Sequence, residues 1–389
     1  MPYQLLEQLY LIDLCTGCKK IWTYLRLIKP VWALFGLNFC LSPVNIELLA
    51  TLMPYPIQFE SRRRSLQRFL KLDCLNIESL WFPLVKKILQ AKFKKSKPLK
   101  LAIERTQWRA QNVFMLSLIW EKRSIPLYWL LLDKKGSSNI CEQKALITPV
   151  LELLSDYKII ILGDREFGSI KLAYWLCEKK VKFILRVKQG RYIQEKNADY
   201  ILLSDLGLLP GESFYLSDVK VTKQKGFGTF DIAAYWSRKY RGKPENEGWY
   251  LLTNLGDLKQ SIDTFKCRSG IEAMFKDCKT GGYNLEKSHA NNQRLNSLIL
   301  LIAIAYSCAL LQGEKIKRMG IQKYVGRLTE YGRSLRRHSS FWIGLYGQCW
   351  VVGMEFCQDI IIELMRIRRN KLPFFQRGMR AMSLILSMF

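Results

Sequence analysis

Histidine is nearly absent from this sequence of 389 residues, which contains only His289 and His338. A closed zinc site needs four nitrogen or sulfur ligands, and the pair Cys15-x2-Cys18 has no second CxxC pair to complete such a site. We therefore interpret these two cysteines as small apolar residues of a helix. Internal repeats and low-complexity segments are also absent, which argues against a repeat architecture.

Acidic residues are few compared with basic ones. The chain has 33 Asp and Glu against 61 Lys and Arg, which gives a formal charge of +28 at pH 7. So large an excess favours a polyanionic partner, with nucleic acid first and an anionic membrane surface second. The hydrophobic share of 49% and the aromatic share of 12% indicate a globular protein, because a disordered basic tail lacks such residues. The length allows two or three domains.

A long uncharged run occurs once, over Leu295–Gly313, and it is long enough to cross a bilayer. A helix buried on all sides has the same composition. We favour the buried helix, because polar residues such as Asn296 and Ser307 dilute the run, and a membrane anchor is the alternative. No signal peptide is expected, since Glu7 and Asp13 interrupt the apolar N-terminal segment. The eleven scattered cysteines are therefore expected to be reduced thiols of a cytosolic protein.

Residues 1–97 are predicted to form a helical DNA-binding domain. Ser42-Pro43 predicts the start of a short helix over Val44–Leu52, and Met53-Pro54-Tyr55-Pro56 ends that helix. A second helix begins near Glu60 and is basic. A helix, a turn and a basic helix resemble a helix-turn-helix, whose second helix enters a major groove; a solvated basic face is the alternative. The predicted DNA contacts are Arg62, Arg63, Arg64 and Arg68.

From Lys100 onward, short apolar runs alternate with helical patterns and predict an α/β domain over residues 98–313. The order of elements matches a ribonuclease H-like fold, with a β-rich insertion at about 195–258 and a basic helical region over 314–389. The predicted strands are 101–103, 113–120, 125–132, 158–162 and 181–187, and the predicted helices are 141–154 and 169–179.

Three acidic residues stand at positions suited to a metal site. Glu104 follows the first predicted strand, Asp164 follows the fourth, and Glu272 lies on a helix predicted from Phe265-x2-Arg268-x3-Glu272-x6-Lys279. Carboxylates from different elements hold the two metal ions of enzymes that cut phosphodiesters, and Mg2+ prefers oxygen ligands. We therefore predict a site for two Mg2+ ions, for which Mn2+ substitutes. Alternatives nearby are Glu166 and, on another helix face, Asp277.

Five short motifs follow one another along the chain. In this order they resemble insertion-sequence transposases of the DDE superfamily, in the IS-four group with its Tyr-x2-Arg-x3-Glu-x6-Lys signature. The resemblance runs from about residue 45 to residue 312. The motifs are Glu104-Arg105-Thr106-x-Trp108, Gly163-Asp164-Arg165-Glu166-Phe167, Trp249-x-Leu251-Leu252-Thr253, the signature around Glu272, and Lys279-Thr280-Gly281-Gly282-Tyr283.

The resemblance implies a function and a set of roles. The three acids would form the catalytic triad of cut-and-paste transposition, in which one strand is hydrolysed, a hairpin forms and the end is joined to target DNA. Arg268 and Lys279 would grip phosphates near the cut. Trp249 would stack on a flipped base, and Arg186 and Lys188 would contact nearby DNA. A homodimer on terminal inverted repeats, in a bacterial cytoplasm at the nucleoid, is also implied.

Two residues depart from the pattern of that family. Glu104 stands where the family has Asp, and the extra methylene moves the carboxylate by a distance that can cost ~100-fold in rate. Phe265 stands where the family has Tyr, which removes a hydroxyl whose hydrogen bond is worth ~0.5–1.5 kcal/mol. A catalytically inactive DNA-binding remnant of a transposase is therefore the alternative function.

Overall fold

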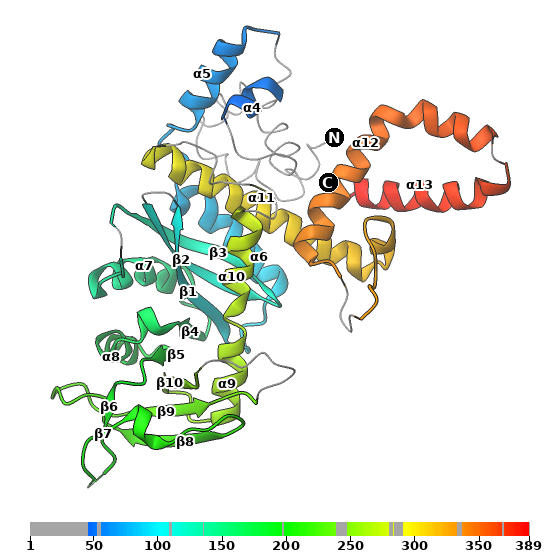
Figure 1. Ribbon diagram of the computed structural model, residues 1–389. Coiled ribbons are helices and arrows are strands. Elements are labelled where there is room, and N and C mark those ends of the chain that lie inside the picture. The colour runs from blue at the N-terminus through cyan, green and yellow to red at the C-terminus, as the bar shows by residue number, and fades with distance from the viewer. Residues whose placement is uncertain are drawn as a thin grey trace. The chain divides into compact units, whose positions relative to one another are not determined.

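The computed structural model describes residues 46–388 apart from 53–55, 109–110, 135, 197, 239–246, 280–282, 284–290, 333–336 and 368 (Figure 1). Cys15 and Cys18 lie outside these residues, as does most of the predicted turn after Leu52. The chain divides into two compact units, of which one is Val85–Phe275 and the other contains the described residues before and after it. The three domains that we expect from the sequence remain a prediction.

The unit Val85–Phe275 is built on an eight-stranded mixed sheet with the order β3-β2-β1-β4-β5-β10-β9-β8. Strands β1, β2 and β3 form an antiparallel meander, and β1, β4 and β5 run parallel to one another. The β1–β5 order agrees with the predicted α/β core. The strands are β1 Leu99–Trp108, β2 Gln111–Trp120, β3 Arg123–Leu132, β4 Ile159–Gly163, β5 Lys182–Val187, β8 Ser213–Val219, β9 Phe230–Tyr235 and β10 Trp249–Thr253.

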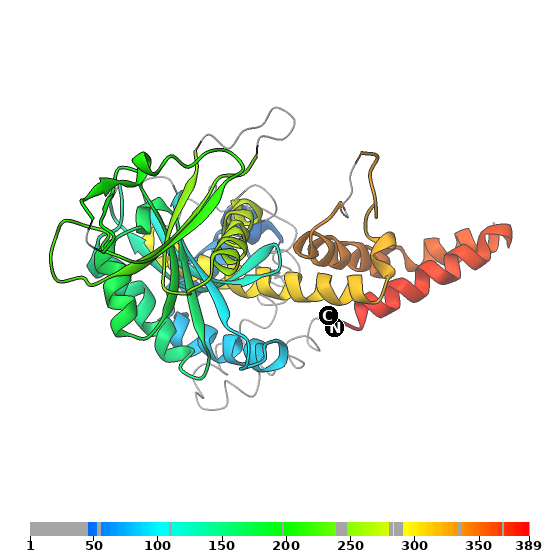
Figure 2. The ribbon, with the colours of Figure 1, turned by 90° about the horizontal axis from the view of Figure 1, so that it is seen from below.

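Helices lie against both faces of this sheet. Figure 2 shows α7 (Ile140–Leu153) and α8 (Ile170–Glu178) on one side and α9 (Leu258–Lys266) on the other. All five residues of β4 are buried, as expected for a central parallel strand in a sheet that has helices on both faces. Helix α7 begins with a capping box, in which Asn139 accepts a hydrogen bond from the Glu142 amide and the Glu142 side chain bonds the Asn139 amide. Short elements of this unit are η2 Arg165–Phe167, β6 Tyr192–Ile193, β7 Ile201–Leu202 and η3 Leu203–Leu206.

The β-rich segment predicted as an insertion at about 195–258 is β-rich, but most of it is not a separate sheet. Strand β10 pairs antiparallel with β5, and β9 and β8 follow it at the edge of the main sheet. The sheet continues because Tyr250–Thr253 matches Ile184–Val187 in register. Strands β6 and β7 form a small sheet of their own. The segment therefore extends the surface on which the predicted site residues lie.

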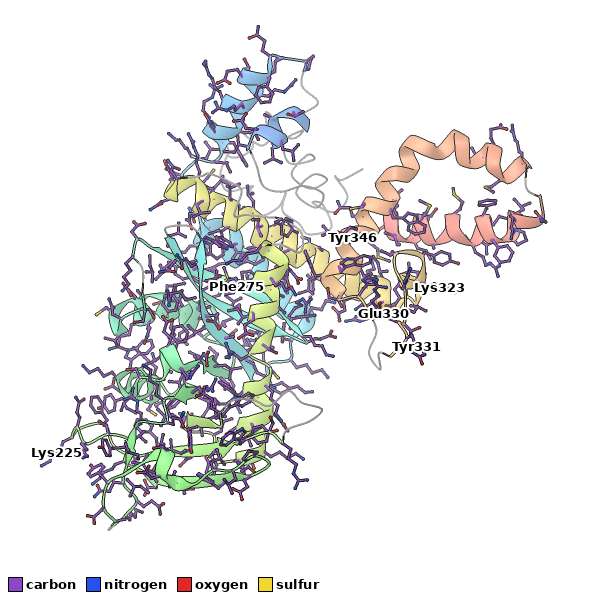
Figure 3. The ribbon with its side chains drawn as sticks, in the orientation of Figure 1. Lys225, Phe275, Lys323, Glu330, Tyr331 and Tyr346 are labelled. Atoms are coloured by element: carbon purple, nitrogen blue, oxygen red, sulfur yellow. The ribbon has the colours of Figure 1, made fainter. Side chains whose placement is uncertain are left out.

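The helix predicted from Phe265 to Lys279 is interrupted, which corrects the sequence-based prediction. Helix α9 ends at Lys266, and α10 (Ser269–Lys279) begins after a turn at Cys267 and Arg268. In this turn the Arg268 amide donates to the Phe265 carbonyl, three residues back. Gly270 then passes close to the β2–β3 turn, where an added Cβ would lie 2.6 Å from the Arg123 carbonyl oxygen. The buried face of α10 includes Phe275, which is labelled in Figure 3.

The other unit is helical, and its core contains the long uncharged run. That run lies within α11 (Asn292–Arg318), a helix long and apolar enough to cross a membrane, yet 78% of its most apolar window is buried. Helix α12 (Ser340–Ile367) packs on it through Gly313 and Gly344, where an added Cβ would overlap a backbone carbonyl. The burial favours the core interpretation. Further elements of this unit are η1 Ile77–Trp81, η5 Ile321–Tyr324, η6 Arg369–Lys371 and α13 Leu372–Leu386, and α6 (Phe82–Lys92) begins here and continues in the unit Val85–Phe275.

The two helices predicted near the N-terminus are present as α4 (Ile46–Leu52) and α5 (Phe59–Phe69). Arg62 of α5 donates to the carbonyls of Ala50, at 2.8 Å, and Ile57, at 3.0 Å, and so ties the pair together. Arg63 pairs with Glu47 and Glu60. Two of the four arginines predicted to contact DNA therefore make bonds that stabilise the helix pair itself.

Replacing Gly270 with Ala is expected to lower the free energy of unfolding by about 1–3 kcal/mol, because the new methyl group collides with rigid backbone at Arg123. Urea unfolding of the full chain measures the change. Gly190→Ala is the matched control, since an added Cβ there meets nothing within 4 Å. Equal stability of the two variants would contradict this packing of α10.

Candidate active site

The parallel pairing of β1 with β4 places two of the predicted acids side by side. Ile103 and Gly163 form the last pair of this parallel register. The residues that follow them, Glu104 and Asp164, therefore lie beside each other at the end of the pairing. Glu104 does not end its strand as predicted, because β1 continues to Trp108 through its antiparallel pairing with β2. Glu104 therefore lies within a strand that is still hydrogen-bonded to β2 at this position.

Arg268 connects these two acids with Glu272. Its Nη1 lies 2.5 Å from Oε2 of Glu104, and its Nη2 lies 2.6 Å from Oε1 of Glu272 and 3.9 Å from Oδ2 of Asp164. The Arg268 side chain is only 13% exposed. The structure thus brings together the three predicted acids, and it does so around a guanidinium group that the sequence places on the same signature.

The electrostatics of this cluster follow from burial and from like charges. The pKa of Glu104 is raised to about 7, mainly by burial and to a smaller extent by the neighbouring carboxylates of Asp164 and Glu272, whereas the Arg268 charge and a backbone hydrogen bond from Arg105 act to lower it. The pKa of Arg268 is raised above its ordinary value: burial lowers it, but the charges of the three acids outweigh burial. One cation and three acids in a partly desolvated place leave the cluster with an excess of negative charge.

A second arginine approaches Asp164 from β5. Nη1 of Arg186 lies 3.7 Å from Oδ1 of Asp164, and its Nη2 lies 2.7 Å from Oε1 of Glu247, which also pairs with Arg165 at 2.6 Å. Glu247 was missed by the sequence analysis, because it lies just before β10 in no motif. Its contact with Arg186 arises only when β10 pairs with β5.

The donor chemistry of the three acids fits a divalent cation. All are carboxylate oxygens, which Mg2+ prefers, and the buried Oδ1 of Asp164 accepts no hydrogen bond. As they are placed around Arg268, however, the described part of the chain contains no set of three acid, His or Cys side chains gathered closely enough to hold an ion. The residues fit a metal, provided that the guanidinium leaves its central position.

The alternative acids are engaged elsewhere. Glu166 accepts hydrogen bonds from Nε of Arg105 at 3.0 Å and from the Ser138 amide at 2.9 Å. Asp277 accepts a bond from the Tyr306 hydroxyl at 3.4 Å. The choice of Glu104, Asp164 and Glu272 over the two alternatives remains a prediction.

Trp249 belongs to an aromatic cluster beside the site. Its ring lies 5.2 Å from Phe265 and 5.8 Å from Tyr235, edge to face in both cases, and it is partly exposed. Phe265 is 3% exposed, and the Arg268 guanidinium lies 5.8 Å from its ring centre. The position where the family pattern has Tyr is therefore a packing position in this chain, and Trp249 combines core contact with an accessible part.

The other residues predicted to contact DNA are Lys188, Lys279, Arg64 and Arg68. Lys188 is exposed just after β5, and Lys279 is the last residue of α10 and belongs to the helical unit. Arg64 and Arg68 are exposed on α5. Their contacts with DNA remain a prediction.

Replacing Arg268 with Ala is expected to lower the free energy of unfolding by about 3 kcal/mol at neutral pH, since a buried acid loses its partner. Adding Glu104→Gln to that variant is expected to restore part of the loss, because it removes the uncompensated charge. Urea unfolding of the two single variants and the double variant measures this coupling. Additive effects would show that the contact between Arg268 and Glu104 carries no net energy.

One family model matches most of the α/β unit and the beginning of the helical C-terminal part. The family model described as "Transposase DDE domain" matches residues 100–308. No curated protein matches the chain. Among solved structures, the chain is similar to the piggyBac transposase synaptic complex with hairpin DNA, at 13% identity and a TM-score of 0.40, over 83% of this chain and 72% of that one. That score is too low to support an argument. The family model covers more than half of the sequence, and the protein therefore belongs to the family of transposase DDE domains.

Proposed function

We propose that this protein is a DNA transposase of the IS-four group that moves an insertion sequence by cut-and-paste transposition. Membership of the DDE family supports DNA cutting and joining in general. The observation that carries the proposal is the convergence of Glu104, Asp164 and Glu272, from β1, the end of β4 and α10, on one guanidinium. Acids on three different elements are what a two-metal phosphodiester site requires.

Glu104, Asp164 and Glu272 are the proposed ligands of two Mg2+ ions, with Mn2+ as a substitute. Such ions, when bound, activate the attacking oxygen and stabilise the leaving oxygen. The contribution of the chain is to hold the oxygen ligands on two paired strands and a packed helix. This rigidity reduces the reorganisation that the reaction needs.

Basic and aromatic residues are the proposed DNA contacts. Arg268 and Lys279 bind phosphates near the cut, and Trp249 stacks on a flipped base with the exposed part of its ring. Arg186 and Lys188 contact DNA near the cluster. On α5, the exposed side chains of Arg64 and Arg68 support groove contact better than do those of Arg62 and Arg63, which are half-buried and bind α4 and the turn before α5. Arg64 also pairs with Glu60.

The proposed substrates are the terminal inverted repeats of the element and a target duplex. Hydrolysis of one strand frees a 3′ hydroxyl, which attacks the opposite strand to form a hairpin before the end is joined to target DNA. Two ends are held by a homodimer in the bacterial cytoplasm at the nucleoid. The net charge of +28 supports a long DNA contact.

A catalytically inactive DNA-binding protein is the second candidate. The observation that favours it is Glu104, whose side chain is one methylene longer than the Asp of the family pattern and is bonded to Arg268 at 2.5 Å. Such a protein keeps the basic surface and lacks cleavage.

Asp164→Ala is expected to abolish Mg2+-dependent cleavage of DNA carrying the flanking inverted repeats, while affinity for that DNA, measured without divalent metal, stays within about twofold. The loss is expected because the variant removes a proposed metal ligand and leaves the basic residues in place. Gel-based cleavage and binding assays measure both quantities. Glu152→Ala, which removes an exposed acid of α7, is the control. Cleavage at the native rate by Asp164→Ala would place the metal site elsewhere.

Glu104→Asp separates the two candidate functions. An active transposase that tolerates Glu at this position is expected to cut with Mg2+ or Mn2+, and Glu104→Asp then changes the rate by up to ~100-fold in either direction. Cutting by Glu104→Asp combined with no cutting by the native chain identifies an inactivated transposase. If neither protein cuts repeats that it binds, either the damage extends beyond Glu104 or the assignment of Glu104 as the first acid is wrong.

A further inference from the structure

Arg268 occupies the point at which the three acids meet. Both Nη atoms are engaged, with Glu104 at 2.5 Å and Glu272 at 2.6 Å, and Asp164 lies at 3.9 Å. The residue stands in the short turn between α9 and α10, outside either helix. The protein therefore supplies its own cation to the acid cluster.

A divalent ion and this guanidinium compete for the same oxygens. Mg2+ requires close, well-directed oxygen ligands, whereas Oε2 of Glu104 and Oε1 of Glu272 already accept short charge-assisted hydrogen bonds. Two cationic centres among three closely spaced acids, of which Glu104 is the most buried, also repel each other. An arrangement with metal on the acids is therefore one in which Arg268 has turned away.

A DNA phosphate offers Arg268 an alternative partner. The guanidinium binds phosphate in the same bidentate manner as carboxylate, so leaving the acids costs less when a phosphate is at hand. On the other side of the cluster, Arg186 is retained by Glu247 at 2.7 Å and stays near Asp164. When DNA binds, Arg268 is thus the arginine expected to exchange its carboxylate partners for a phosphate, whereas Arg186 is expected to keep its pairing with Glu247.

We propose that Arg268 is an internal counter-cation that closes the metal site of the DNA-free protein, so that a DNA phosphate and a divalent metal ion bind cooperatively by exchanging partners with it. This inference rests on the proposed function of Glu104, Asp164 and Glu272. Linkage makes the effect reciprocal: DNA tightens metal binding by the same factor by which metal tightens DNA binding. A metal site that opens on DNA restricts the chemistry to protein that is already bound to its substrate.

Mn2+ binding to the full chain, followed by electron paramagnetic resonance without DNA, tests the competition. Arg268→Gln is expected to bind Mn2+ about tenfold more tightly than the native protein, within the ~5–150-fold range of such couplings. Lys266→Gln is the matched control, because it removes a positive charge two residues away that pairs with Asp263 and contacts none of the three acids. Its Mn2+ affinity is expected to equal that of the native protein.

The same titration with a duplex carrying the flanking repeats tests the cooperativity, after subtraction of Mn2+ bound to the duplex alone. DNA is expected to tighten Mn2+ binding by the native protein about tenfold and to have little effect on Arg268→Gln. Asp164→Ala, which removes a proposed ligand, is expected to bind Mn2+ weakly with or without DNA. The native comparison needs no variant, so a native affinity that DNA does not alter overturns the exchange even if Arg268→Gln fails to fold.

The two hypotheses fail in different ways. Mn2+ affinity that is unchanged or weaker in Arg268→Gln, or a native affinity that DNA does not alter, overturns the exchange while leaving the metal site in place. Absence of Mn2+ binding that depends on Asp164, in every protein and with DNA present, overturns the metal site and the exchange together. Arg268→Lys, which keeps the charge but lacks the planar fork, is expected to show a smaller gain than Arg268→Gln.

Discussion

Three carboxylates of like charge stand close together in this protein, and one guanidinium makes the arrangement possible. Without a cation among them, Glu104, Asp164 and Glu272 would repel each other in a place where burial already disfavours charge. The rise of the Glu104 pKa to about 7 shows that Arg268 compensates only in part. The cluster is therefore held by a balance between the repulsion among the acids and their attraction to Arg268.

The backbone supplies the other half of this arrangement. The parallel register of β1 with β4 aligns Ile103 with Gly163 and so places Glu104 next to Asp164. Gly270 lets α10 pass against the β2–β3 turn, and this close approach accompanies the contact of Arg268, which also binds Glu272 four residues further on, with Glu104. The acids thus meet because of one strand register and one close helix contact, both of which are local consequences of the sheet.

The extension of the sheet gives the acid cluster a second basic neighbour. Strand β10 pairs with β5, and residues just before it bring Glu247 to Arg186. Glu247 holds Arg186 and Arg165 together, while Trp249 on the same strand packs against Phe265. The segment that the sequence suggests as an insertion therefore supplies residues that contact the arginine and the aromatic side chain beside the acid cluster.

Much of the site and of its surrounding elements was determined by the sequence. Apolar runs and turn residues place the β1–β5 strands and the helices α7 and α8, because burial of alternating or continuous apolar residues depends on local pattern. The spacing of Arg268 and Glu272 also predicts their contact. The break at Cys267, the continuation of β1 past Glu104 and the contact of Glu247 with Arg186 were decided only by the tertiary structure. Each depends on strands and helices distant in the chain, whose register no local spacing encodes, and so does the position of Arg268 at the centre of the acids.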